Sequence, residues 1–152
     1  MVKVLFLDDD NSSLSQIGAA YLHRIGNKIF EVKSAGIHAG NLNAYMLDMM
    51  LEKRFPVTQL FTKPIQYFLR KEENFQYIIS FLPEHKAEQV TLFPAAETIM
   101  YWNIKDLRGF EGNEQEIISH TRKIFDAVRH EVRAFIRMHM DKMSKAEAVF
   151  QL

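Results

Sequence analysis

Residues 2–18 read VKVLFLDDDNSSLSQIG, and this stretch decides how the chain begins to fold. Its first six residues are apolar except for Lys3, which is typical of a strand in the centre of a parallel sheet. Three aspartates follow at 8–10, and a helical pattern begins near Ser13. A strand that leads through a polar loop into a helix is a common phosphate cradle, because the first N–H groups of the helix point at the ligand. The three acids raise the question of whether this loop binds an anion, a cation or no ligand.

Strand and helix patterns alternate along the rest of the chain. We expect strands at residues 2–7, 29–35, 77–82 and 97–102, and helices at 13–25, from Asn41 or Asn43 to 54, after Pro64, at 84–89 and at 113–138. This alternation implies parallel crossovers, and hence an α/β three-layer sandwich with a four-stranded parallel sheet. In such sheets ligands lie beyond the carboxyl ends of the strands, where the aspartates stand.

Two of the helices carry clear signals. In the first, Leu14, Ile17, Tyr21 and Ile25 share one face. In the last, Asn113 and Glu116 resemble a capping box, and apolar residues follow at three- and four-residue steps to about Met138. We expect the helical histidines to be surface residues: His23, His120, His130 and His139. Residues 1–140 form the expected domain, and 141–152 a polar C-terminal tail.

Composition narrows the function further. The 152 residues fit one domain, and 19 basic and 19 acidic residues leave no net charge to recruit nucleic acid or an anionic membrane. No apolar stretch near the N-terminus is long enough to span a bilayer, so we expect a cytoplasmic protein with no nucleic acid and no membrane partner. Cysteine is absent, which excludes disulfides, thiolate metal sites and a thiol nucleophile within the chain.

Two families with acidic loops fit only part of the pattern. The start resembles a receiver domain of two-component signalling, but the middle of the chain, EKRFPVTQLFTKP, lacks the phosphoacceptor aspartate. Asp8 and Asp10 have the spacing of the nucleophile and acid in haloacid-dehalogenase-type phosphatases, which use magnesium. The later lysine and acidic pair of that family are not evident.

A third resemblance covers residues 2 to about 138. The blocks NSSLSQIGAAYLHRIG, FEVKSAGIHAGNLN, FTKPI, FQYIISF, LFPAA and YWNIKD occur in the order and spacing of low-molecular-weight protein tyrosine phosphatases and the related thioredoxin-coupled arsenate reductases. The resemblance implies a phosphotyrosine-phosphatase-I-like domain with flavodoxin-like topology. It also implies that Asp8 stands at the position of the nucleophilic cysteine, Leu14 at that of the arginine and Asp106 at that of the general acid.

The loop keeps part of the family pattern, since Asn11 and Ser15 retain the family's residue types. Its other candidate binding residues are Asp9, Asp10, Ser12 and Ser13. Leucine cannot form the bidentate fork by which arginine holds an oxyanion. A further charge about 4 Å from an aspartate costs on the order of 4 kcal/mol at an effective dielectric of 20. We therefore do not expect the loop to bind phosphate.

Two roles remain open for the acids. Asp8 and Asp10, with Asp9 and Asp106 near them, offer hard oxygen ligands for Mg²⁺ or Ca²⁺, although neighbouring residues rarely all converge. Alternatively, one aspartate caps the helix in place of a phosphate, which stabilises by roughly 0.3 to 1 kcal/mol. We expect a catalytically silent phosphatase-like protein, a pseudophosphatase that needs no cofactor and acts as a binding or regulatory module for an unknown protein partner. The alternative is a metal-assisted or Asp-dependent phosphohydrolase that uses the same cleft.

Overall fold

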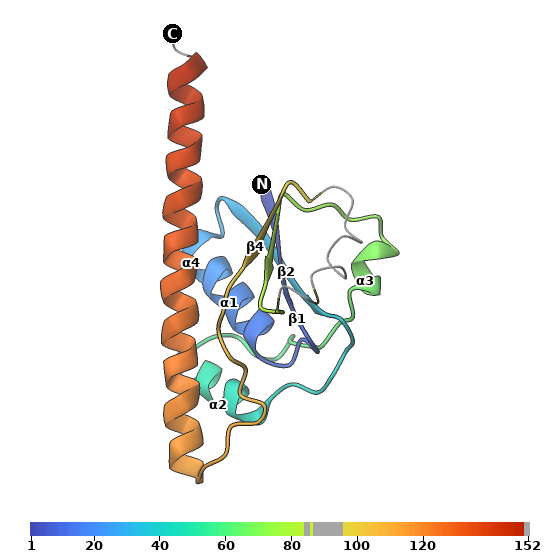
Figure 1. Cartoon of the computed structure of the whole chain (residues 1–152), viewed down its shortest axis with the longest axis vertical. Helices are drawn as coiled ribbons and strands as arrows, with labels where there is room; N and C mark the ends of the chain where they lie inside the picture. The colour runs from blue at the N-terminus through green and yellow to red at the C-terminus, as the bar shows by residue number, and fades with distance from the viewer. Residues whose placement is uncertain (84–85, 87–95, 151–152) are drawn as a thin grey trace.

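A four-stranded parallel sheet forms the centre of the computed structural model, which describes residues 1–83, 86 and 96–150 (Figure 1). Its strands are β1 (Val2–Asp8), β2 (Phe30–Gly36), β3 (Tyr77–Ser80) and β4 (Thr98–Tyr101). They lie in the order β2-β1-β3-β4, and every neighbouring pair is parallel. Each strand begins within one residue of its predicted start. The predicted α/β class and parallel sheet are confirmed.

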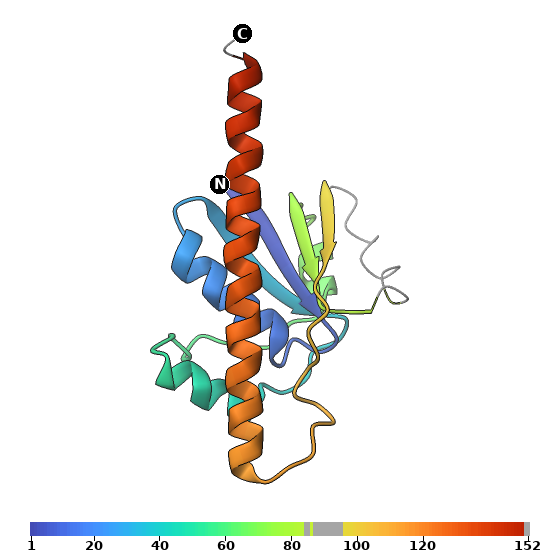
Figure 2. The ribbon, with the colours of Figure 1, turned by 60° about the vertical axis from the view of Figure 1, so that its left-hand side comes forward.

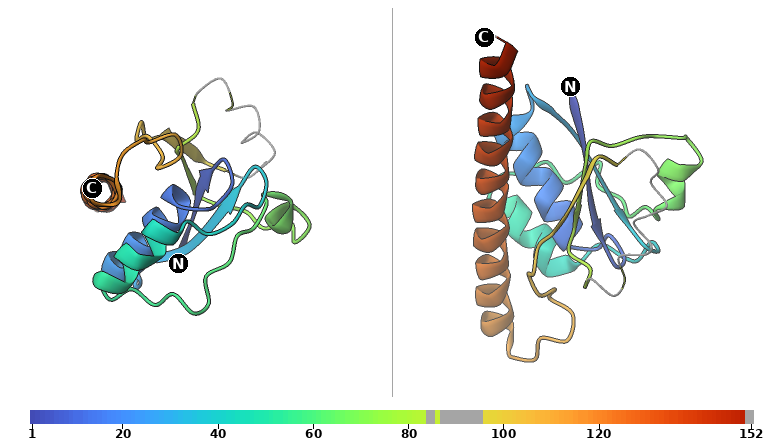
Figure 3. Two further views of the ribbon diagram at one scale, coloured as in Figure 1. Left: turned by 90° about the horizontal axis from the view of Figure 1, so that it is seen from below. Right: turned by 45° about the horizontal axis from the view of Figure 1, so that its top comes forward.

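The side chains of β1 divide the core into two halves. Val4 and Phe6 face the cluster that includes α1 (Leu14–Gly26) and α4 (Glu114–Phe150), whereas Leu5 and Leu7 face the cluster that includes α3 (Gln66–Leu69). This is the two-residue alternation of a strand covered on both faces. Figure 3 shows α1, α2 (Ala44–Glu52) and α4 on one side of the sheet and α3 on the other. The sandwich therefore has the three predicted layers.

The helices α1 and α2 differ from prediction in detail. Ile25 is 42% exposed, because the buried stripe of α1 passes through Leu22 and Gly26 instead. Asn43 caps α2 by accepting a hydrogen bond from the Met46 N–H at 3.0 Å. That helix ends at Glu52 rather than at Arg54, which adopts a left-handed φ of 63° as the chain turns toward Pro56.

The last helix, α4, is longer than predicted. Asn113 and Glu116 form the expected capping box, with the Glu116 N–H donating to Asn113 Oδ1 at 2.9 Å. The helix then continues to Phe150 rather than ending near Met138, and its last turns project beyond the sheet (Figures 1 and 2). No glycine or proline interrupts residues 114–150, so the helix meets no stop signal there.

His139 corrects a second prediction about α4, because its side chain is buried rather than at the surface. Its Nδ1 lies 2.8 Å from the Tyr77 hydroxyl, and its ring packs against Phe30. Burial, together with the charge of Lys142, lowers the pKa of His139. The predicted helix at 84–89 lies outside the described residues except for Lys86. In the part of the chain that is described, no helix has both the length and the apolar character to cross a membrane.

Candidate functional site

The loop between β1 and α1 is built around the carboxylate of Asp8, which is only 3% exposed. The Asn11 N–H donates to Asp8 Oδ1 at 2.6 Å, and the Ser15 N–H donates to Oδ2 at 2.9 Å. Ser15 lies in the first turn of α1, where N–H groups have no partner within the helix. Asp8 therefore caps the helix from seven residues upstream, which is one of the two roles that the sequence left open for the aspartates.

The pKa of Asp8 is raised from its ordinary value of 3.8 to about 6. Burial is the largest cause, because it disfavours the charged form. Hydrogen bonds from Ser15 and Asn11 oppose the rise, and the negative charge of Asp106 adds to it. The carboxyl group is thus held near the start of α1 at the cost of its solvation.

Asn11 joins the loop to its surroundings. Its backbone has a left-handed φ of 60°, which asparagine tolerates better than most residues. Its side-chain amide donates to Ser15 Oγ at 2.7 Å, while its Oδ1 accepts from the Gln16 amide at 3.1 Å and from the Lys63 N–H at 2.9 Å. A buried side chain with this many partners fixes the shape of the loop.

Lys63 precedes Pro64 in a turn, where a lysine is usually solvated, but here its side chain is held beside the loop. Its ammonium donates to Asn11 Oδ1 at 3.3 Å, Ser34 Oγ at 3.3 Å and the Phe61 carbonyl at 3.2 Å. The residue is drawn in because the Gly36 N–H donates to the Lys63 carbonyl, which places the segment beside β2. Burial first, and then repulsion from Lys33, lower the pKa of Lys63 to about 8.

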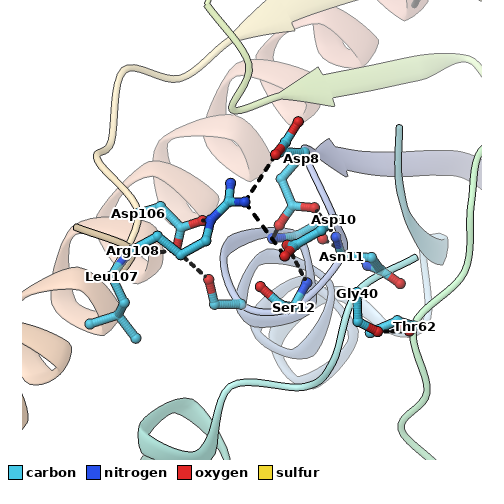
Figure 4. A network of polar contacts seen from close by, with 12 residues as sticks. Asp8, Asp10, Asn11, Ser12, Gly40, Thr62, Asp106, Leu107 and Arg108 are labelled. Carbon is cyan, nitrogen blue, oxygen red and sulfur yellow. Dashed lines mark hydrogen bonds and ion pairs between the residues drawn. The ribbon is translucent and has the colours of Figure 1, made fainter. Parts of the chain in front are cut away.

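The remaining acids of the loop meet at Arg108 (Figure 4). Its guanidinium lies 2.9 Å from Asp9 Oδ2, 3.6 Å from Asp10 Oδ2 and 3.1 Å from Asp106 Oδ2. Lys86 adds a second cation, 3.6 Å from Asp9 Oδ1. Although burial acts to raise it, the pKa of Asp9 is lowered by the hydrogen bond from Arg108 and the charges of both cations. Each of these three carboxylates therefore has a cationic partner within the chain itself.

Asp106, which the sequence resemblance aligned with the general acid of that family, lies beside the loop. Its Oδ1 accepts hydrogen bonds from the Ser13 hydroxyl and the Leu107 N–H, each at 2.6 Å. Ser12 is placed by its N–H, which donates to Asp10 Oδ1 at 3.1 Å. The structure thus brings the predicted loop residues together, but as hydrogen-bonding partners of one another.

Two glycines allow the loop to lie close to the chain after β2. A Cβ on Gly36 would stand 2.6 Å from the Asn11 nitrogen, and one on Gly40 would stand 2.7 Å from Asp10 Oδ2. Both distances are far below an ordinary contact, so a side chain at Gly36 would displace the loop backbone and one at Gly40 would displace the Asp10 side chain. The pattern AGIHAG predicts a turn at these glycines, but it does not indicate that the acidic loop packs against them.

A cleft of about 880 Å³ opens beside the loop between β3, β4 and the segment that follows them. Phe81, Tyr101, Trp102 and Phe110 line it together with Asp8, Leu14, Lys105 and Arg108. Leu14, which the sequence resemblance aligned with the arginine of that family, is buried in the apolar core. Within the described residues, no group of three histidine, aspartate or glutamate side chains is placed to hold a metal ion.

Arg108 and Lys86 are the charged residues that sequence reasoning missed at this site. Arg108 follows Asp106 by two residues, yet its partner Asp9 is 99 positions away in the chain. No periodic or capping pattern marks either cation. Both cations follow the carboxyl ends of later strands. This position is the one sequence feature that points to them, because the carboxyl ends of parallel strands share an edge of the sheet with the loop.

Comparison with known proteins places the fold. No family model and no curated protein matches the sequence. Among solved structures, an arsenate reductase in its phosphate binding state matches with a TM-score of 0.70 and 24% identity, over 91% of this chain and 98% of its own. The tyrosine phosphatase amsI of Erwinia amylovora matches with a TM-score of 0.70 and 14% identity, over 91% and 93%. DARP, an arginine phosphatase of Drosophila, matches with a TM-score of 0.69 and 17% identity, over 91% and 98%.

These similarities cover almost all of both chains. At such low identities they establish the shared fold and not the reaction. The sequence resemblance to low-molecular-weight phosphatases and arsenate reductases is therefore confirmed as a likeness of fold.

Proposed function

We propose that this protein is a catalytically silent form of the phosphatase and arsenate reductase fold, which binds a protein partner through the cleft. The observation that carries this proposal is the position of the Asp8 carboxylate. It accepts the N–H groups of Asn11 and Ser15, which in an open loop would be free to bind an oxyanion. The loop thus supplies its own anion.

The chemistry of the other positions supports the same proposal. The chain has no cysteine to act as a thiolate, and Leu14 has no donor for an oxyanion. A phosphate dianion at the loop would meet Asp8 as well as Asp9 and Asp10. Arg108, which offsets these charges, is already engaged by three carboxylates.

The metal-assisted alternative is not favoured. Both oxygens of Asp8 accept backbone N–H groups, while Asp10 accepts from Ser12 and faces Arg108. A nucleophilic Asp8 would have to leave its position at the helix. The cleft itself is suited to recognition, because Tyr101 and Phe110 present exposed rings at its wall and exposed aromatic rings are common anchors in protein interfaces.

Turnover of p-nitrophenyl phosphate, with and without Mg²⁺, tests whether the protein is silent. We expect none above the buffer rate from the wild-type chain. Turnover that is abolished in an Asp8→Asn variant would contradict the proposal and restore the phosphohydrolase alternative.

The occupied loop has its own test in sulfate binding. Asp8→Ala frees the N–H groups of Asn11 and Ser15, so sulfate should raise the melting temperature of this variant and not that of the wild type. Asp126→Ala, which changes charge equally on the exposed face of α4, serves as the control. Equal stabilisation of all three proteins by sulfate would show that Asp8 does not fill the loop.

A further inference from the structure

A second hollow, of about 710 Å³, lies beside the edge strand β2. It is enclosed by α1, β2, α3 and the segment that joins α2 to α3, which passes along the outer side of β2 (Figure 3). We call it the basic pocket, because its lining includes Arg24, Lys33, Lys63 and Lys71. It shares no lining residue with the cleft described above.

The cations of the basic pocket form no close ion pair within the described residues, although the charge of Asp8 acts on Lys63 from farther away. Among the described residues, no carboxylate lies within 4.0 Å of the charged nitrogens of these four side chains. Glu73 also lines the pocket, but its carboxylate is paired with Lys3 at 2.9 Å. The positive charges of Lys33 and Lys63 are close enough to repel each other. An anion between them would relieve this repulsion.

Aromatic rings form much of the pocket wall. The Arg24 guanidinium lies 3.4 Å from the centre of the Phe55 ring, and its N–H groups donate to the carbonyls of Lys53 and Arg54. The Lys71 ammonium lies 4.0 Å from the centre of the Tyr67 ring. These contacts hold the cations against flat apolar surfaces, on which a planar ligand could also stack.

The exposed edge of β2 adds hydrogen-bonding groups. Gly36 pairs on its outer side with Lys63 and Ile65. Because alternate residues of a strand direct their N–H and C=O groups to the same neighbour, Val32 and Ser34 direct theirs to the same outer side. Both residues line the basic pocket, and no other described backbone group pairs with them there.

We propose that the basic pocket binds a small organic anion with a flat apolar body, such as an aryl sulfonate, phosphate or carboxylate. Lys33, Lys63 and Lys71 supply the positive charge that holds the anionic group, the rings of Phe61 and Tyr67 contact the flat body, and the edge of β2 offers it a donor and an acceptor. The volume lies within the range of roughly 300 to 1,000 Å³ that is usual for small-molecule sites. This proposal does not rest on the proposed silence of the cleft, since the two hollows share no lining residue.

An NMR titration of the full chain with 1-naphthalenesulfonate tests this inference. We expect the largest amide shifts at residues 32–34 and 59–63, and affinity weakened about tenfold or more in Lys33→Glu and in Lys71→Glu. Lys28→Glu changes the charge equally at an exposed position outside the pocket lining and should bind as the wild type does. The uncharged analogue 1-naphthalenemethanol should bind about tenfold more weakly than the sulfonate.

Three results would overturn the inference: shifts confined to the cleft around Trp102, affinity unchanged in the two lysine variants, or no shift up to the solubility limit of the probe. Lys33→Gln and Lys71→Gln remove the positive charges without introducing negative ones. They replace the glutamate variants in the test if either of those does not fold. Each must weaken binding for the proposal to stand.

Discussion

The cleft and the basic pocket differ in how their charges are balanced. At the cleft, Asp9, Asp10 and Asp106 share Arg108, and Asp8 takes two backbone N–H groups. At the basic pocket, the cations contact carbonyls, hydroxyls and rings, and no described carboxylate pairs with them. A charged site that is balanced within the chain gains little from a small ion, whereas an unbalanced one gains from a ligand of opposite charge.

Asn11 connects the two regions, so its removal should have the largest effect. We expect Asn11→Ala to lower the free energy of unfolding by about 2 to 4 kcal/mol, because buried partners lose their hydrogen bonds and alanine is strained at a positive φ. Urea denaturation measures this change. Asn11→Gly removes the side chain without the strain and should recover about 1 kcal/mol of the loss. A change below 1 kcal/mol in Asn11→Ala would mean that the loop does not depend on this residue.

The raised pKa of Asp8 predicts a pH dependence of stability at the cleft. Below about pH 4 the carboxyl group is protonated in both the folded and the unfolded chain. Between 3.8 and about 6 only the folded chain retains the proton, so the stability that Asp8 contributes at low pH is lost as the pH rises through 6. The loss is on the order of 3 kcal/mol for a shift of this size.

The difference in unfolding free energy between wild type and Asp8→Asn isolates this contribution, since other titrating groups are common to both proteins. We expect the wild type to lose stability relative to Asp8→Asn between pH 4 and pH 7, and the difference to stay constant above that range. A flat difference over that range would contradict the buried position of the carboxyl group.

Arg108→Ala removes the cation that balances the rim. Its side chain is 47% exposed, so we expect a loss of stability below about 1 kcal/mol. The released carboxylates of Asp9, Asp10 and Asp106 should instead bind a cation. Tb³⁺ luminescence sensitised by Trp102, the single tryptophan of the chain and part of the cleft lining, should rise in the variant. Arg122→Ala breaks an exposed ion pair with Glu52 and is the control; equal luminescence in both variants would exclude this account.

Local sequence patterns predicted the secondary structure on which the cleft is built. Residues 2–18 carry the strand, the loop and the helix in one continuous stretch, so β1 and α1 follow from the order of residues along the chain, whereas the capping role of an aspartate was one of two open possibilities. Parallel pairing follows from the alternation of strands and helices. Asn113 caps its helix as predicted, and Asn43 is the one of the two predicted asparagines that caps α2, because a cap depends on neighbours within three or four residues.

The parts that sequence could not predict depend on contacts between distant residues. Arg108 reaches Asp9 across 99 positions, and Lys63 lies beside the loop because its segment pairs with the edge of β2. His139 was placed on the surface because its burial depends on Tyr77 and Phe30, which its own helix does not reveal. Hydrophobic periodicity describes which face of an element is covered, but not which polar groups are brought to it.

We expect the smallest effect from a substitution in the basic pocket, Lys33→Ala. This substitution tests whether the positive charges of the pocket lack a negative partner. Lys33→Ala should leave stability unchanged or raise it by a few tenths of a kcal/mol, because it removes a cation that repels Lys63 and has no carboxylate partner. The pKa of Lys63 should rise above about 8 in this variant, which NMR of ¹³C-dimethylated lysines can measure. Lys71→Ala removes an equal charge that does not act on Lys63, so it should leave that pKa unchanged. If Lys33→Ala instead destabilises the protein as the loss of an ion pair would, Lys33 has an acidic partner, and the contrast between the two regions fails.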